Sequence, residues 1–287
     1  MPLRSAPSTQ EILECLQRSG YVLESRIVRS VDGAGYFVEP NQVVVDPRTG
    51  KSREIDLVAE QDGWDRSRPN VSVRTIFAIE AINNPLPIVL MTRRPWSPSA
   101  PFEDYVKCAT TPDPSPFLDD VELFRARGLD NAVLYSQYCG ITRKRGDAEG
   151  KTTGSQRPLM ASHPDDMYSS LLKLSEFVVR EVAFARSRDW REGDHYWRLW
   201  FWEAVLVVGG DLLAFELADD GTPSIDELDS GHLIFNFHAN DEPKTVVVKV
   251  VRERRLLALL AENAAVDRRL AAELHSYLTS NPEPSAP

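Results

Sequence analysis

The sequence contains little cysteine and little histidine. Its three cysteines, Cys15, Cys108 and Cys139, are far apart and lack the spacing of metal ligands. The five histidines show no zinc-type spacing either. An odd number of scattered cysteines is typical of reduced thiols. These absences argue against a disulfide scaffold and a zinc site, and we expect a cytoplasmic protein.

Long apolar runs and common catalytic motifs are also missing. The chain opens with no apolar signal core, and its most apolar region, residues 196–217, is interrupted by charged residues such as Arg198, Glu203 and Asp211. A bilayer-spanning helix needs about 20 predominantly apolar residues, so we expect buried strands here and no membrane partner. We find no Gly-rich phosphate loop and no Gly-x-Ser-x-Gly sequence.

The bulk composition is that of an ordinary globular protein. Hydrophobic residues make up 42% of the 287 residues and charged residues 26%, with a net charge of −10 and a pI near 5.1. This acidity argues against a broadly basic nucleic-acid binder, although a local basic groove can occur on an acidic protein.

The order of apolar patterns predicts a mixed α/β fold. Near the N-terminus we expect a helix from Ser8 or Thr9 to about Arg18, followed by extended segments at 25–31, 35–38, 42–45, 53–59, 74–81 and 87–91. The Asp-Gly pair at 32–33 predicts a hairpin between the first two of these segments. Six prolines predict an irregular connection over residues 92–116.

The second half adds helices and more strands. We expect a short helix at 118–127, a short strand or helix at 131–138, a basic loop at 143–157 and a long helix at 165–186. Two strands at 201–208 and 211–217 should then form a hairpin at Gly209-Gly210. A strand at 246–251 and a helix at 252–278 follow. The prediction is a mixed β-sheet flanked by helices in one domain over residues 9–278, with core motifs at 10–92, an extension at 117–278, and flexible tails at 1–8 and 279–287.

Two acidic residues interrupt apolar strands. They are Asp56, in the sequence Ile-Asp-Leu-Val-Ala, and Glu80, in Ile-Glu-Ala-Ile. An unpaired carboxylate in a buried strand is costly, whereas two carboxylates at one end of a sheet can hold Mg²⁺. The alternative is that these acids simply pair with Arg26, Arg53 or Arg74.

The order of these elements resembles the PD-(D/E)XK, or restriction-endonuclease-like, nuclease superfamily. In that pattern a Glu lies on the first helix or the strand after it, an Asp on a hairpin strand, and Glu-x-Lys on the next strand. Glu24, Asp56 and Glu80 match these acids, and Asn83-Asn84-Pro85 resembles the polar turn that often follows. The resemblance covers roughly residues 10–92 and implies a restriction-endonuclease-like core.

The resemblance also implies a metal-dependent reaction on DNA. Asp56, Glu80 and the carbonyl of Ala81 would bind Mg²⁺ or Mn²⁺, and Glu24 would complete the set or hold a water. The metal would lower the pKa of a water and stabilise charge on the phosphodiester.

The lysine of the pattern is missing, because Ile82 occupies its position. Three explanations stay open. The lysine has migrated, with Lys173 as the best candidate and Lys107 and Lys151 as weaker ones; the fold persists without its chemistry; or the sequence carries a substitution at this position. Lys173 could also be an ordinary surface lysine whose stem covers apolar residues.

Two main functions follow from these observations. The first is a nuclease that cleaves DNA phosphodiesters with a migrated lysine. The second is a catalytically inactive nuclease-fold protein that serves as a nucleic-acid- or protein-binding subunit, for example in a bacterial defence or stress system. In that case the Leu-rich helix at 252–278 could mediate self-association. Metal-dependent hydrolysis of a nucleotide is a third option. The basic loop at 143–157 could contact phosphates or be merely solvated.

Overall fold

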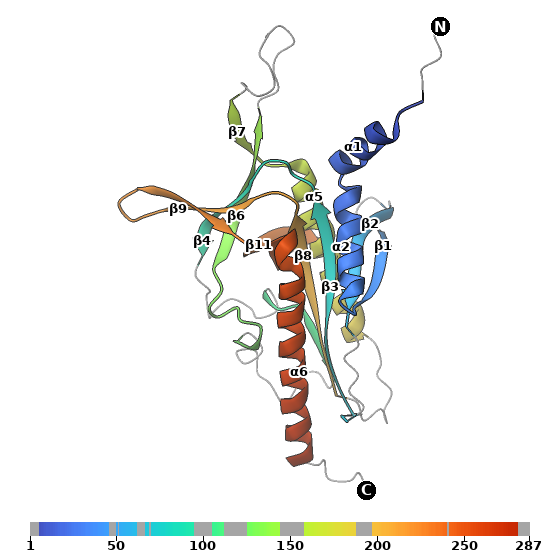
Figure 1. Ribbon diagram of the computed structural model, residues 1–287. Helices are drawn as coiled ribbons and strands as arrows, with labels where there is room; N and C mark the ends of the chain where they lie inside the picture. Colours follow the sequence, from blue (N-terminus) through green and yellow to red (C-terminus); the bar gives the residue numbers. More distant parts are fainter. Residues whose placement is uncertain are drawn as a thin grey trace.

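The computed structural model describes residues 6–45, 50, 52–61, 67–68, 70–94, 105–111, 125–143, 158–187, 197–239 and 241–280 (Figure 1). The helices are α1 (Thr9–Ser19), α2 (Tyr21–Gly33), α5 (Asp165–Ser187) and α6 (Leu256–Ser280), with a 3₁₀ turn η2 (Glu253–Arg255) before α6. The strands are β1 (Phe37–Val45), β2 (Ser52–Glu60), β3 (Val71–Ile82), β4 (Ile88–Arg94), β5 (Cys108–Thr111), β6 (Leu134–Arg143), β7 (Leu159–Ser162), β8 (Trp197–Val208), β9 (Leu212–Leu217), β10 (Pro223–Leu228), β11 (Ser230–Ala239) and β12 (Glu242–Arg252).

All of these strands belong to one mixed sheet, which confirms the predicted fold class. The main order is β1-β2-β3-β8-β12-β11-β6-β4-β9-β10, with β5 paired to β8 and β7 to β6. Strands β1, β2 and β3 form an antiparallel meander, and β8 then runs parallel to β3 along its whole length. A parallel neighbour requires a crossover connection. Helix α5 lies in that connection and packs against both β3 and β8.

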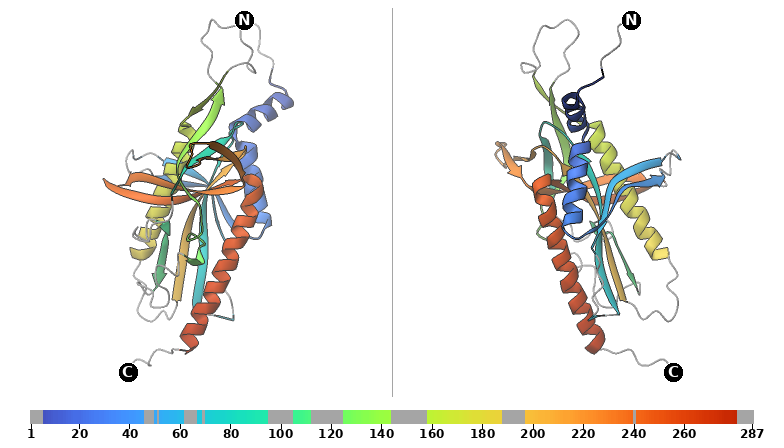
Figure 2. Two further views of the ribbon diagram at one scale, coloured as in Figure 1. Left: turned by 90° about the vertical axis from the view of Figure 1, so that its left-hand side faces the viewer. Right: turned by 45° about the vertical axis from the view of Figure 1, so that its right-hand side comes forward.

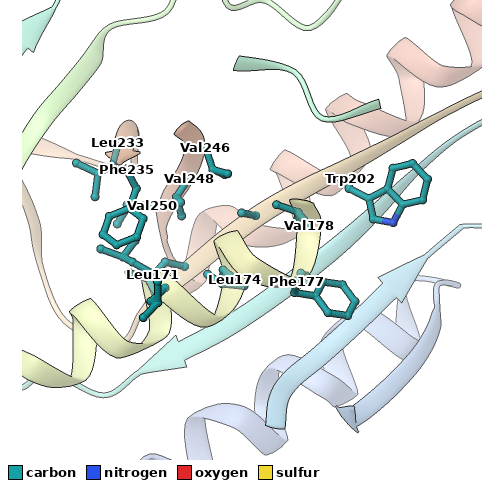
Figure 3. Packing of buried hydrophobic residues seen from close by; sticks show 14 of the residues in the cluster. Leu171, Leu174, Phe177, Val178, Trp202, Leu233, Phe235, Val246, Val248 and Val250 are labelled. Carbon is teal, nitrogen blue, oxygen red and sulfur yellow. The ribbon is translucent and has the colours of Figure 1, made fainter. Parts of the chain in front are cut away.

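The helices cover the two faces of the central strands (Figures 1 and 2). On one face, α5 packs with alternate residues of β3, β8 and β12 in the largest core cluster, part of which Figure 3 shows. On the other face, α2 and α6 pack against the intervening residues, including Leu57, Phe77 and Val205. Because both faces of β3 and β8 are covered, their sequences are nearly continuous apolar runs, as is usual for parallel strands.

A buried polar network fastens α6 to the sheet. The guanidinium of Arg127 bonds Glu203 on β8 and contacts Asp267 on α6 at 3.2 Å, while the ammonium of Lys249 on β12 lies 3.2 Å from Glu203. Burial by itself raises the pKa of Glu203, but Lys249 and Arg127 outweigh burial and lower it to about 2. Each of these buried charges therefore has a partner of opposite sign, as buried charges need.

The segment at 25–31 was predicted to be extended, and this prediction is wrong. It belongs to α2, whose buried residues Leu23, Ile27 and Val31 recur every four positions. The β-branched residues of the segment favoured a strand, but their spacing places them on one helical face against the sheet. Strand β1 therefore pairs with β2 and not with this segment.

The predicted hairpin at Gly209-Gly210 is also wrong. Strand β8 pairs with β3, β5 and β12, whereas β9 pairs with β4 and β10. The glycines have another role, since a Cβ on Gly210 would lie 2.3 Å from the carbonyl oxygen of Asn84. The pair therefore lets the Asn83-Asn84 turn approach the end of β8 closely.

Other predicted elements agree in outline. Helix α1 begins after the Ser8 cap, and α5 and α6 occupy the two long predicted helices. The proline-rich connection contains strand β5, which was not predicted. The tips of both tails, most of the helix at 118–127 and residues 144–157 of the basic loop lie outside the described residues. No described helix is both long enough and apolar enough to cross a bilayer.

Candidate active site

A pocket of about 610 Å³ opens where the ends of several elements meet. The end of α1, the beginnings of α2 and α5, strand β2 and the end of β3 with its following turn all contribute to its wall. It is lined by Arg18, Ser19, Glu24, Asp56, Glu80, Ala81, Ile82, Asn83, Asn84, Pro85, Ile88, Thr142, Pro164, Asp165, Asp166, Met167, Ser170 and Lys173. The structure thus brings together every residue predicted for the catalytic and metal-binding site.

The two strand acids meet because β2 and β3 are antiparallel neighbours. The pairing of β2 with β3 ends at Leu57 and Ile79, and Asp56 and Glu80 are the next residues on the two strands. The Asp56 N–H donates to Glu80 Oε1 at 3.3 Å, and the Ala81 N–H donates to Asp56 Oδ2 at 2.8 Å. Two carboxylates held this close repel each other, so this pair calls for a compensating cation.

Lys173 supplies such a cation from the neighbouring helix. Its Nζ lies 2.6 Å from Glu80 Oε2 and donates to the carbonyl oxygen of Glu54 at 3.0 Å. Only 18% of the Lys173 side chain is exposed, so the ammonium points into the pocket instead of into solvent. Among the weaker candidates, Lys107 does not line this pocket, and Lys151 lies outside the described residues.

Glu24 approaches the pair from the first turn of α2. Gly20, whose φ of 94° is left-handed, ends α1 and begins α2. This joint turns the chain so that both Arg18 and Glu24 face the pocket. Burial and the Asp56 carboxylate raise the pKa of Glu24, while Lys173 opposes the shift.

The electrostatics of the pocket are dominated by crowded carboxylates. Glu80 is 1% exposed. Burial, together with the Asp56 charge, raises its pKa to about 7, although Lys173 and the Ser170 hydroxyl act in the opposite direction. Burial also raises the pKa of Asp56, against the effects of the Ala81 N–H and Lys173. A second cation at these acids would therefore be strongly favoured.

Two of the three arginines considered as simple partners, Arg26 and Arg74, lie elsewhere. Arg26 bonds Glu253 at 2.7 Å, and Arg74 bonds Glu60 at 3.1 Å. Neither lines this pocket. The pairing predicted as the alternative explanation is therefore wrong for these two arginines.

Sequence reasoning missed one supporting residue, Ser170, and the contact that Asn83 makes. Ser170, one turn before Lys173 on α5, hydrogen-bonds Glu80. The Asn83 amide donates to the Gln17 carbonyl and ties the turn after β3 to α1. Ser170 and Lys173 are three residues apart on one helical face, and this spacing could have indicated Ser170. The contact between Asn83 and Gln17 joins segments that are distant in sequence, so the sequence held no signal for it.

We expect Glu80 to make stability depend on pH. A carboxyl whose pKa is raised on folding stabilises the fold below its unfolded value, near 4.5, and loses this contribution as pH rises through about 7. Relative to the Glu80→Gln variant, the unfolding free energy of the wild type should fall by roughly 1–3 kcal/mol between about pH 5 and pH 8. Urea unfolding at both pH values measures this difference.

The matched control is Glu273→Gln, which changes a carboxylate that is half exposed on α6. Its pH dependence should equal that of the wild type. Parallel pH profiles for the wild type and Glu80→Gln would contradict the assigned pKa of Glu80.

No family model, curated protein or solved structure matches this chain. Among the described residues, no three or more His, Cys, Asp or Glu side chains form a ready metal-binding group. The case for a function therefore depends on the geometry of the pocket itself.

Proposed function

We propose that this protein cleaves DNA phosphodiester bonds, with Mg²⁺ or Mn²⁺ at Asp56 and Glu80. The observation that carries the proposal is the 2.6 Å contact between Lys173 Nζ and Glu80 Oε2 in a pocket that Asp56 also lines. The ammonium that the strand motif lacks at Ile82 is thereby provided by α5. Lys173 is the migrated lysine of this proposal.

The arrangement of the elements supports the resemblance to the restriction-endonuclease-like pattern. A helix carries Glu24, the second strand of the β1–β2 hairpin carries Asp56, and the adjacent strand β3 carries Glu80. Helix α5 then crosses the sheet and returns the chain to β8, beside β3. This is the order of motifs expected from the sequence, now with their side chains in one pocket.

The donor set fits a hard divalent cation. Two carboxylates and the Ala81 carbonyl offer only oxygen ligands, and Mg²⁺ commonly takes one or two carboxylates while keeping waters and substrate phosphates as its other ligands. Glu80 also needs a positive charge to be ionised at neutral pH, because its pKa lies near 7. A bound cation would supply Lewis-acid stabilisation of the phosphate and a water of lowered pKa.

The remaining residues have defined tasks in this proposal. The Lys173 ammonium donates a hydrogen bond to a non-bridging phosphate oxygen or to the attacking water, and its charge offsets the charge that develops on the phosphate. Glu24, across the pocket, accepts a hydrogen bond from that water and fixes its direction. Arg18 at the end of α1 contributes positive charge to the same wall.

Metal binding gives a test that does not depend on finding the natural substrate. Calorimetric titration with Mg²⁺ or Mn²⁺ should reveal binding at millimolar concentration or tighter. The Asp56→Asn variant should weaken it by about tenfold or more, because it removes one of two charged ligands. Asp229→Asn, which alters a carboxylate 53% exposed and bonded to Arg254, is the control. Absence of binding to the wild type would contradict the metal site.

A binding subunit without catalysis is the second candidate, and one feature favours it. Helix α1 buries none of its residues, and its apolar Ile12, Leu13 and Leu16 are 39–48% exposed. Figure 1 shows α1 projecting from the sheet near the N-terminus. Such a face suits a protein partner. Absence of cleavage by the metal-loaded wild type, together with burial of the α1 face against a protein partner, would favour this candidate.

A further inference from the structure

A second pocket, of about 210 Å³, lies between α5 and the strands β1–β3 and β8. Five aromatic side chains line this aromatic pocket, namely Phe37, Phe177, Phe184, Trp200 and Trp202. Phe177 and Trp202 are buried and form its floor, whereas Phe37 and Phe184 are 60% and 54% exposed and flank its opening. In Figure 3, Phe177 and Trp202 lie at the end of the core away from Leu233 and Phe235.

Two polar groups in the aromatic pocket have unused hydrogen-bonding capacity. The side-chain oxygen of Gln42 and the Nε of Arg74 are buried, and neither has a hydrogen-bond partner in the described part of the chain. Orphaned buried polar atoms are uncommon and costly in folded proteins. A ligand with a donor for the Gln42 oxygen and an acceptor for the Arg74 Nε–H would satisfy both groups.

The backbone places Gln42 in the aromatic pocket by breaking the alternation of β1. Phe37 and Glu39 face the aromatic pocket in the usual step of two, but Gln42 also lines it. Asn41 between them has a φ of 54°. This left-handed residue shifts the phase of the strand and turns the Gln42 amide inward.

The charges of the aromatic pocket narrow the class of ligand. Arg74 is already paired with Glu60 and stacks over Trp200 at 4.1 Å, so its guanidinium is held in place, and its buried Nε–H has no partner among the described residues. Glu39 and Glu181 also line the wall. Carboxylates repel a phosphate group but accept hydrogen bonds from an amino group on an uncharged ring.

We infer that the aromatic pocket binds an unpaired nucleobase. A flat heteroaromatic ring stacks on aromatic side chains, and its edge carries adjacent donor and acceptor atoms that suit the Gln42 amide and the Arg74 Nε–H. This inference names the substrate of the proposed function and rests on that function for the identity of the polymer. Base binding itself needs neither the metal nor the acids of the active site.

The aromatic pocket and the acids lie on the same face of β3. Arg74, Ile76, Ala78 and Glu80 alternate on the face of β3 that α5 covers. Arg74 and Glu80 are six positions apart on the strand, or about 20 Å. Ile76 and Ala78, which lie between them, are buried beneath α5, so the two pockets open at opposite ends of this covered stretch. The substrate class is therefore a nucleic acid with an unpaired base.

Nucleosides test the inference because they contain a base but no phosphate. Adenosine, cytidine, guanosine and thymidine are titrated into the full chain without metal, and binding is followed by calorimetry. At least one should bind with a millimolar or lower dissociation constant. Phe37→Ala and Phe184→Ala should each weaken that binding by about fivefold or more, the usual loss when a stacked aromatic ring is removed.

Three further variants test the polar contact, provide a control and separate base binding from metal binding. Arg74→Lys keeps the positive charge but removes the Nε–H, and it should also weaken nucleoside binding. Leu257→Ala, which removes a 41% exposed side chain on α6, is the matched control and should leave binding unchanged. Asp56→Asn should bind nucleosides like the wild type, so that failure of base binding and failure of metal-dependent cleavage are observed separately.

Three results would overturn the inference of base binding. Absence of nucleoside binding at millimolar concentration overturns the inference, as does binding that neither phenylalanine variant weakens. Binding of tetramethylammonium in place of nucleosides also overturns it, because it would make the aromatic pocket an organic-cation site.

Discussion

Replacing Glu80 by Gln, or Asp56 by Asn, is expected to reduce Mn²⁺-dependent cleavage of oligonucleotides by about 10³-fold or more. The two carboxylates lie close together on the neighbouring strands β2 and β3, and each is an anionic ligand of the proposed cation. Loss of a ligand removes several kcal/mol of transition-state stabilisation, and each 1.36 kcal/mol is a factor of ten in rate. Gel analysis of labelled single-stranded and duplex DNA measures the rates.

The Glu80 variant separates loss of chemistry from loss of fold. Because the ionised form of Glu80 is disfavoured by burial, Glu80→Gln should be at least as stable as the wild type above about pH 7. An inactive but stable variant thus assigns the effect to the site. Glu273→Gln provides a matched exposed control on α6. Full cleavage by both Asp56→Asn and Glu80→Gln would refute the assignment of the active site.

Moving the lysine should move the activity with it. Lys173→Met is expected to lower cleavage by about 10²-fold or more, since it removes the ammonium 2.6 Å from Glu80. The second change, Ile82→Lys, restores a lysine two residues after Glu80, at a position that lines the same pocket. The double variant should recover about tenfold or more of the activity lost in Lys173→Met. Initial cleavage rates of the three proteins are compared at equal Mn²⁺ concentration.

This exchange has clear controls. In Lys173→Met, Glu80 can become neutral by taking up a proton, so that the variant avoids an unpaired buried charge. Lys244→Met changes a lysine 38% exposed on β12 and should leave cleavage unaltered. Wild-type activity in Lys173→Met would contradict the role of Lys173. Failure of Ile82→Lys to restore any activity would contradict the equivalence of the two lysine positions.

Local patterns predicted the elements whose apolar spacing was unambiguous. The strands at 53–59 and 74–81 and the helix at 165–186 correspond to β2, β3 and α5. The segment at 25–31 was mistaken because its β-branched residues favour a strand locally, while packing of Leu23, Ile27 and Val31 against the sheet selects a helix. The glycines at 209–210 were mistaken for a hairpin because close backbone approach leaves the same sequence signature as a tight turn.

The aromatic pocket could not be predicted from the sequence. Its phenylalanines come from β1 and α5, and its tryptophans come from β8. The aromatic residues around position 200 read most simply as core, and Phe201 and Trp202 are indeed buried. The exposed Phe37 and Phe184 gain meaning only when the fold places them at one opening, beside Gln42 and Arg74.

The sequence by itself determined the acids of the candidate site and the mixed α/β class. Asp56 and Glu80 stand out because charge is rare in buried strands, and this local rule needs no tertiary information. Only the tertiary structure decided where the compensating ammonium lies. Lys173 is 93 residues from Glu80 in sequence, and its place beside that carboxylate follows from α5 crossing the face of β3. The spatial order of strands and helices sets such long-range pairs, and no single segment encodes it.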